Sequence, residues 1–299
     1  MFREYAIEPA ALPSWEAVRF FLSNVGPWRG RFIAQYPKHW KRMVYEALTC
    51  ADIARARVEV YLDSLDPRVF SPRPGAPYDP ERTWLANALA EHARLPFDEI
   101  IAADPGAAAG VAEAATVTED HPAWRRDQGR LVARDPATFA AALTRLLAAS
   151  RRVAIIDPYF RGDQRDKRAP LAALVAHVQV TATVEIHAST LHIADHHFRQ
   201  VARQHLPTDL PLGRAVTLHT WQQRLGGPRL HNRYLITDVG GVQFGDGVET
   251  GAPGESDRVS ILEEATRAEL WKHFVDPGTA FDRIGVAITV TGTGPGRRR

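Results

Sequence analysis

The segment Arg229–Asp238 contains the residue types and spacing of a nucleophilic site for phosphoryl transfer. One residue separates His231 from Arg233, and Asp238 follows after four more. On a β-strand, residues two apart point to the same face, so His231 and Arg233 would share a pocket, with Asp238 at the turn after the strand. A histidine can attack phosphorus and hold it as a phosphohistidine, while a neighbouring cation binds the non-bridging oxygens. The pattern predicts a phosphodiesterase site whose catalytic residues are His231, Arg233 and Asp238.

The spacing alone is not specific, because it occurs twice more if Glu is accepted in place of Asp. The other two matches are His39-Trp-Lys41 with Glu46 and His92-Ala-Arg94 with Glu99. The first lies in a predicted helix, where residues two apart diverge by about 200° and cannot serve one pocket. The second is interrupted by Pro96. Neither is followed by a strand, a turn and a glycine-rich return, so only the third match has a suitable context.

From residue 136 onward, short apolar runs alternate with helical stripes, which predicts a layered α/β domain with a mixed, mostly parallel sheet over residues 136–292. Strands are expected at 153–157, 178–186, 215–220, 229–237, 242–244 and 284–290. Helices are expected at 136–150 (with Asp135 as N-cap), 170–177, 194–205 and 259–274. The strands 229–237 and 242–244 should form a hairpin closed by a glycine-containing loop. Residues 293–299 are expected to be a flexible basic tail.

Residues 1–135 are expected to form a mainly helical N-terminal region of unknown role. Apolar residues recur every three or four positions from His39 to Leu65, which predicts one long helix, and a second helix is expected from Pro80 to about Arg94. Residues 103–135 have the composition of a connector. Aromatic and basic side chains are mixed in this region, and they would form either an aromatic core with a basic rim or a surface for single-stranded nucleic acid.

Polar residues stand at the ends of three predicted strands, as Asp157-Pro-Tyr159, His187-Ala-Ser189 and His219-Thr-Trp221. In open α/β sheets, ligands bind at the carboxyl ends of the strands. We therefore expect Asp157, Tyr159 and His187 to line the substrate pocket. Arg161, two residues further along, is a candidate phosphate contact.

The segment Leu230–Asp238, followed after six residues by Gly245, resembles the HKD motif of the phospholipase D superfamily, His-x-Lys-x4-Asp-x6-Gly-Ser-x-Asn. The runs 153–160 and 184–189 are similar to the first two strands of one half of that fold. The resemblance covers about residues 140–275 and does not extend to residues 1–135. It implies a phospholipase-D-like fold and a metal-independent phosphodiesterase without cofactors. Many single-motif members are nucleases, so DNA or RNA is the expected substrate, and Gly245 is expected in the substrate site.

Three departures from the motif affect this prediction. Arg233 replaces lysine, which keeps the charge and adds a fork suited to phosphate. The Gly-Ser-x-Asn element reads Gly245-Asp-Gly-Val248, which makes Glu249 or Asp246 the candidate to replace its lost polar groups. There is one motif, whereas the family's chemistry needs two histidines, one as nucleophile and one as general acid. A symmetric homodimer would supply the second histidine. The alternative is a catalytically degenerate module for dimerisation, sensing or nucleic-acid binding.

The composition is that of an ordinary globular protein, with 45% hydrophobic and 24% charged residues. The formal net charge of +2 excludes an all-round basic surface for nucleic acid. A single cysteine, Cys50, excludes an intrachain disulfide and a thiolate zinc cluster. No signal-peptide pattern or membrane-length apolar run is present, so a cytoplasmic location without membrane association is expected.

A histidine-rich segment offers a metal-binding alternative. His192 and His196 are one helical turn apart, and His197 and Asp195 lie beside them. A zincin motif would place Glu at position 193, where the chain has Ile193. We therefore expect no metal.

Overall fold

The protein is described by a computed structural model covering residues 1–125, 128–191, 193–276 and 280–294. The chain divides into an N-terminal unit, residues 2–127, and a C-terminal unit that begins at residue 128. The expected boundary at residue 135 therefore lies eight residues further along the chain. Residues 129–133 form a strand of the C-terminal sheet. No helix in the described ranges is both long and apolar enough to cross a bilayer.

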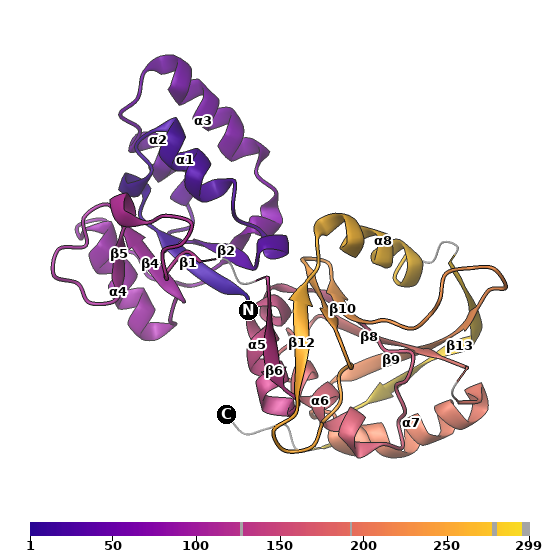
Figure 1. The fold of residues 1–299 in the computed structure, drawn as a ribbon. Helices are drawn as coiled ribbons and strands as arrows, with labels where there is room; N and C mark the ends of the chain where they lie inside the picture. Colours follow the sequence, from indigo (N-terminus) through magenta and orange to yellow (C-terminus); the bar gives the residue numbers. More distant parts are fainter. Residues whose placement is uncertain (126–127, 192, 277–279, 295–299) are drawn as a thin grey trace. The chain divides into compact units, whose positions relative to one another are not determined.

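The N-terminal unit is built around a parallel five-stranded sheet in the order β3-β2-β1-β4-β5 (Figure 1). Its strands are β1 (Arg3–Ile7), β2 (Arg31–Gln35), β3 (Phe70–Pro72), β4 (Glu99–Ala102) and β5 (Val111–Glu113). Its helices are α1 (Trp15–Leu22), α2 (Trp40–Glu46), α3 (Asp52–Ser64) and α4 (Trp84–Arg94), with 3₁₀ turns at Pro9–Ala11, Pro27–Arg29, Pro67–Val69 and Ala114–Thr116. More residues of this unit are in helices than in strands, but the sequence analysis did not predict the central sheet. Each strand is only three to five residues long, too short to show a period.

The helix expected from His39 to Leu65 is wrong, because two helices occupy that range. α2 ends near Ala47, and α3 begins at Asp52. Between them the amide of Thr49 donates to the carbonyl of Pro13, 3.0 Å away, instead of continuing a helical ladder. The apolar periodicity survives because both helices cover the same core, through residues such as Trp40, Val44, Val58 and Leu62.

The C-terminal unit contains an eight-stranded sheet in the order β13-β9-β8-β7-β10-β11-β12-β6 (Figure 1). Its strands are β6 (Gly129–Ala133), β7 (Arg152–Ile156), β8 (Thr183–Ser189), β9 (Ala215–Gln223), β10 (Arg233–Thr237), β11 (Gly241–Phe244), β12 (Ser256–Ile261) and β13 (Phe281–Thr291). Its helices are α5 (Pro136–Ala149), α6 (Arg165–Val175), α7 (Asp195–Asp209) and α8 (Glu264–Phe274). The expected α/β class and mixed sheet are confirmed: β7, β8 and β9 are parallel, and the flanking strands are antiparallel.

Most of the expected elements are present, with shifted ends. Asp135 caps α5 as predicted, accepting from the amides of Ala137 and Thr138. The helix expected at 259–274 begins only at Glu264, because the preceding residues alternate buried and exposed as strand β12. Of the expected basic tail, residues 295–299 lie outside the described residues. Thr293 is described, and its amide donates to the carbonyl of Pro207.

Helices cover both faces of this sheet. α8 covers one face, where Ile156, Ile236 and Trp221 pack against Phe274. α5, α6 and α7 lie on the other face, as Figure 1 shows, and Phe139 of α5 contacts Phe244 of β11 at 5.9 Å between ring centroids. Because side chains alternate along β7, Ile156 faces α8, and Asp157, which follows it, faces α6. This alternation divides the candidate site residues between the two faces.

Candidate active site

His231 and Arg233 meet at the ring of Tyr159. The Tyr159 hydroxyl is hydrogen-bonded to Nδ1 of His231, and the two rings stand edge to face with centroids 5.7 Å apart. The Arg233 guanidinium carbon lies 4.5 Å from the centre of the same tyrosine ring, a cation–π contact. The hydrogen bond occupies Nδ1, so Nε2 is the ring nitrogen left for attack on phosphorus. The structure thus brings together three of the residues expected in the site.

His231 is not on the strand, contrary to the expectation, because β10 begins at Arg233. His231 and Arg233 therefore do not converge through strand alternation. They converge because Tyr159, just beyond β7, contacts both. Its hydroxyl binds His231, in the segment before β10, and its ring lies beside Arg233, the first residue of β10. Both side chains therefore meet through contact with Tyr159, and not through the strand alternation that was expected.

Arg233 is held by the return loop after β11. Its Nη1 donates to the carbonyl of Gly245 at 3.2 Å, and its aliphatic stem lies against Gly247. Gly247 has φ +106°, and a β-carbon there would lie 3.4 Å from Cγ of Arg233. Of the expected substrate-contacting residues, Gly245 thus uses its carbonyl to hold the guanidinium.

Asp257 anchors the same loop and was missed by sequence reasoning. Its Oδ1 accepts from the amides of Gly245 and Asp246, each at 3.0 Å. Asp257 is 3% exposed, and a β-carbon at Gly245 would come within 2.5 Å of its Oδ1. Strand β12, which carries Asp257, was not predicted, because the helix expected from residue 259 covered the second half of that strand.

Asp157 shapes the turn that presents Tyr159. Its Oδ1 accepts from the Tyr159 amide at 2.9 Å, and the carboxyl group is buried. Burial raises the pKa of Asp157, and the nearby charges of Lys167 and Arg233 oppose that shift. Asp157 therefore lies beneath the site and supports Tyr159.

Glu249 is neutralised by two cations that sequence reasoning missed. Its carboxylate is 2.6 Å from Nζ of Lys167 on α6 and 2.5 Å from Nη2 of Arg134. Partial burial alone would raise the pKa of Glu249, but these two cations lower it below its ordinary value. Arg134 also pairs with Glu255 at 3.2 Å. In the structure it is Tyr159, not Glu249, that holds His231.

Asp238 lies at the opposite end of β10 from Arg233. It sits in the turn after the strand, as predicted, and its Oδ1 accepts from the amides of Arg151 and Arg152 at 3.0 and 3.1 Å. A five-residue strand is roughly 16 Å long at about 3.3 Å per residue. The structure therefore does not bring Asp238 to His231, and the contacts of Asp238 fix the start of β7.

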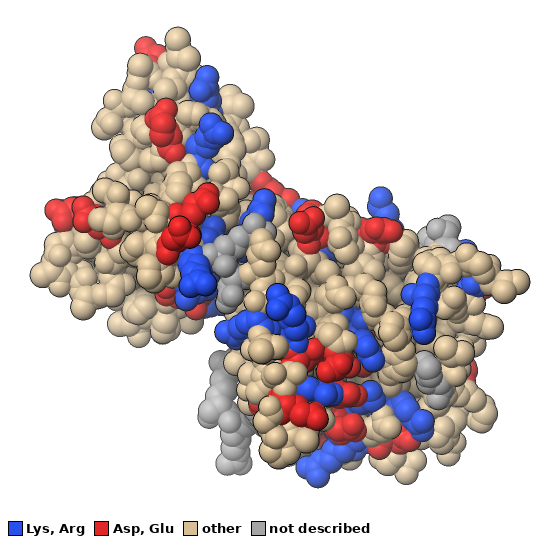
Figure 2. Space-filling view, in the orientation of Figure 1, with Lys and Arg blue, Asp and Glu red and all other residues tan. Residues whose placement is uncertain are grey.

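His187 and Arg161 have partners other than His231. His187 is buried on the α8 face, where it stacks on His219 with centroids 4.9 Å apart and lies edge to face with Phe274. Arg161 pairs with Asp163 at 2.9 Å. Figure 2 shows basic and acidic side chains intermixed on the visible face of the C-terminal unit.

Glu185, His187 and His219 have the composition of a metal site. Nε2 of His187 and Nε2 of His219 lie 3.4 and 3.7 Å from the same Glu185 oxygen. However, Nδ1 of His187 accepts from the Trp221 indole at 3.0 Å, and Nδ1 of His219 faces Arg283 at 2.8 Å.

Indole and guanidinium nitrogens can only donate, so each neutral imidazole carries its proton on Nε2, where a metal would have to bind. The donor set therefore does not fit a cation. Of the histidine-rich alternative, His192 lies outside the described residues. Asp195 there is bonded to Arg199 and Thr220 at 2.7 and 2.6 Å.

Burial lowers the pKa of both histidines in this cluster, that of His219 to about 4. Burial would raise the pKa of Glu185, but hydrogen bonding to His187 and the charges around it bring it below its ordinary value. The cluster is therefore an ionised carboxylate between two neutral imidazoles at neutral pH.

No family model matches the sequence, and no curated protein matches it. Among solved structures, this chain is similar to a phospholipase D family member, Nuc from Salmonella typhimurium. The similarity covers 53% of this chain and 98% of the Nuc chain, at 11% sequence identity and a TM-score of 0.36.

Proposed function

We propose that this protein is a metal-independent phosphodiesterase that cleaves nucleic acid through a phosphohistidine on His231. The observation that supports this most is the contact of His231 and Arg233 with one tyrosine: Tyr159 holds Nδ1 of the histidine, and the guanidinium lies over the same ring. A nucleophile and a phosphate-binding cation are thereby fixed side by side before substrate arrives.

In the proposed reaction, Nε2 of His231 attacks phosphorus, and the bond from phosphorus to the leaving oxygen breaks. The fork of Arg233 binds the non-bridging oxygens as negative charge develops on them. The leaving oxygen takes a proton from a general acid. Water then attacks the phosphohistidine and gives its proton to the same general acid, now deprotonated, as the phosphorus–nitrogen bond breaks; His231 and the acid are both regenerated. The net reaction is hydrolysis of one phosphodiester.

The general acid is proposed to be His231 of a second copy. The reason is the single motif: it occurs once in the sequence with a following strand and glycine-rich return, whereas the chemistry needs one histidine as nucleophile and one as general acid. A two-fold axis near His231 would bring two copies of the pair together and complete the site.

The test is cleavage of bis(p-nitrophenyl) phosphate and of a labelled single-stranded oligonucleotide in EDTA. His231→Ala should abolish cleavage of both, a loss of about a thousandfold or more for a covalent nucleophile. His177→Ala, at an exposed histidine in the turn just after α6, is the matched control. If the wild-type protein cleaves no phosphodiester, the degenerate binding module becomes the better account.

The shared site has a separate test. Sedimentation should detect a dimer, and activity per chain should fall as dilution dissociates it. A strictly monomeric protein with full activity would contradict the proposed second copy.

A further inference from the structure

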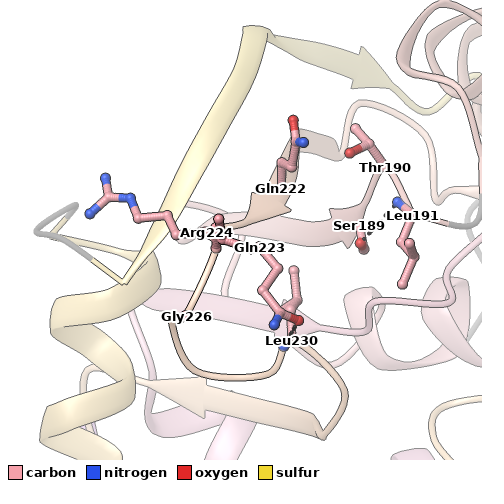
Figure 3. A pocket seen from close by; sticks show the side chains of 9 residues that line it. Ser189, Thr190, Leu191, Gln222, Gln223, Arg224, Gly226 and Leu230 are labelled. Atoms are coloured by element: carbon pink, nitrogen blue, oxygen red, sulfur yellow. Dashed lines mark hydrogen bonds between the residues drawn. The ribbon is translucent and has the colours of Figure 1, made fainter.

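A pocket of about 660 Å³ opens at the carboxyl ends of β8 and β9, and none of the site residues discussed so far lines it (Figure 3). Its lining residues are Ser189, Thr190, Leu191, Gln222, Gln223, Arg224, Leu225, Gly226 and Leu230. This volume lies in the range of pockets that bind small organic molecules. We call it the strand-end pocket.

The strand-end pocket adjoins the candidate active site on two sides. Leu230 directly precedes His231 in the chain. On the other side, the Ser189 amide donates to the carbonyl of Pro158 at 3.2 Å, and Pro158 directly precedes Tyr159. A phosphodiester held at the His231–Tyr159 pair therefore has one of its two substituents beside this pocket.

The pocket walls combine apolar side chains with amides. Leu191 and Leu225 are 76% and 106% exposed, so the rim presents large apolar surface to solvent. Gln222 and Gln223 each offer both a donor and an acceptor, and Figure 3 shows them projecting from neighbouring positions of the same strand. A flat heterocycle with a hydrogen-bonding edge uses both kinds of surface, as flipped and single-stranded bases do.

The charge of the lining favours an uncharged occupant. Among the lining residues that the structure describes, Arg224 is the one that ionises, and Nε of Arg224 pairs with Asp282 at 2.7 Å. In Figure 3 the Arg224 side chain points away from Ser189 and Leu191 on the opposite wall. A phosphate or a charged headgroup would find little compensation here. An acyl chain would cover the Gln222 amide without offering it a hydrogen-bond partner.

We propose that the strand-end pocket binds the nucleobase of the nucleotide whose phosphodiester lies at His231. This inference rests on the proposed phosphodiesterase function and narrows its substrate to nucleic acid with an unpaired base, because a paired and stacked base cannot enter a pocket. Leu191 and Leu225 contact the base, and Gln222 reads its edge.

The test compares a substrate with a base, the p-nitrophenyl ester of thymidine 5′-monophosphate, against one without, methyl p-nitrophenyl phosphate. Leu225→Asp and Gln222→Ala should lower the ratio of kcat/KM for the first to that for the second by about tenfold or more. Both positions are exposed, so the variants should fold. Leu212→Asp, at another exposed leucine outside the pocket, is the matched control and should leave the ratio unchanged. An unchanged ratio in both pocket variants would overturn the proposal.

Binding separates failure of this inference from failure of the proposed function. Saturation-transfer NMR with thymidine should show contact with the wild-type protein and with His231→Ala, and loss of contact in Leu225→Asp. If that pattern holds while no phosphodiester is cleaved, the pocket stands and the enzyme proposal fails. If methyl p-nitrophenyl phosphate is cleaved in a His231-dependent way and thymidine shows no contact, the pocket proposal fails alone.

Discussion

The C-terminal sheet has two similar groups of side chains on its two sides, and their difference separates a candidate site from a structural cluster. Each group contains a histidine, an arginine and an aromatic ring: His231, Arg233 and Tyr159 in one, and His219, Arg283 and Trp221 in the other. Arg233 lies 4.5 Å from the Tyr159 ring, and Arg283 lies 5.3 Å from the Trp221 ring. Residue types alone would not distinguish the two groups.

The hydrogen-bond partners of the histidines distinguish them. Arg283 can only donate to His219, which fixes the proton of that imidazole on Nε2, beside Glu185. Tyr159 carries a hydroxyl, which can donate or accept, so Nε2 of His231 can be a lone pair or a proton donor as a reaction requires. His219 is 7% exposed and His187 only 1%, whereas His231 is half-buried. Catalysis needs a histidine that substrate can reach and whose Nε2 can be either a lone pair or a proton donor, as at His231.

Replacing the two arginines should give the largest contrast. Arg233→Ala should lower kcat/KM for bis(p-nitrophenyl) phosphate by about 10²- to 10³-fold, because the developing charge loses its binding group. Arg283→Ala should lower the melting temperature and leave kcat/KM per folded molecule unchanged. Steady-state kinetics and thermal unfolding of both variants check this. Equal losses of activity would remove the distinction between the two groups.

Tyr159→Phe should have a smaller effect on activity, about ten- to hundredfold in kcat, the range found when a group that orients a reacting ligand is removed. The phenyl ring still lies under Arg233, so KM should change little. The value of kcat should fall because Nδ1 of His231 loses the hydroxyl that orients its ring. Tyr234→Phe, on the next residue of β10 after Arg233, is the control. A lower melting temperature with unchanged kcat per folded molecule would argue that Tyr159 is only structural.

In the opposite group, Glu185→Ala should cost about 1 kcal/mol of unfolding free energy, because the buried Nε2 of His187 loses the carboxylate that lies 3.4 Å away. Activity of the folded protein should remain. Chemical denaturation measures the cost, and Glu269→Gln, at an exposed carboxylate on α8, serves as the control. An unchanged free energy of unfolding in Glu185→Ala would show that the cluster contributes nothing to stability.

The smallest effect expected is a pH dependence of stability from the same cluster. The pKa of His219 is about 4 in the folded protein and ordinarily about 6.5, so between these values the unfolded chain binds more protons. The free energy of unfolding should therefore fall as pH drops from about 6.5 to about 4. His219→Gln should flatten this slope, as measured by denaturation at a series of pH values. If His219→Gln kept the same slope, the pH dependence of stability would come from other groups.

Much of the C-terminal fold could be predicted from sequence, because its strands and helices carry clear periods. The pairing of Tyr159 with His231 could not, since 72 residues separate them and side-chain contact depends on how β7 and β10 pair. Asp238 was grouped with His231 by motif spacing, although the length of a five-residue strand already separates the two ends. In the N-terminal unit, strands as short as Phe70–Pro72 leave no pattern to read.

Strand β6 has a practical consequence for dissecting the chain. It comes first in the C-terminal unit yet pairs at the edge of the sheet, where Leu131 lies opposite Arg258 and Val132 opposite Asp257. A fragment starting at residue 136 would lack β6, and the backbone amides and carbonyls along that edge of β12 would be unpaired and able to bind a strand of another molecule. Such a fragment should self-associate through that edge, and it would also lose Arg134, one of the two cations on Glu249. A fragment starting at residue 128 keeps β6 paired with β12 and keeps Arg134 bound to Glu249 of the return loop.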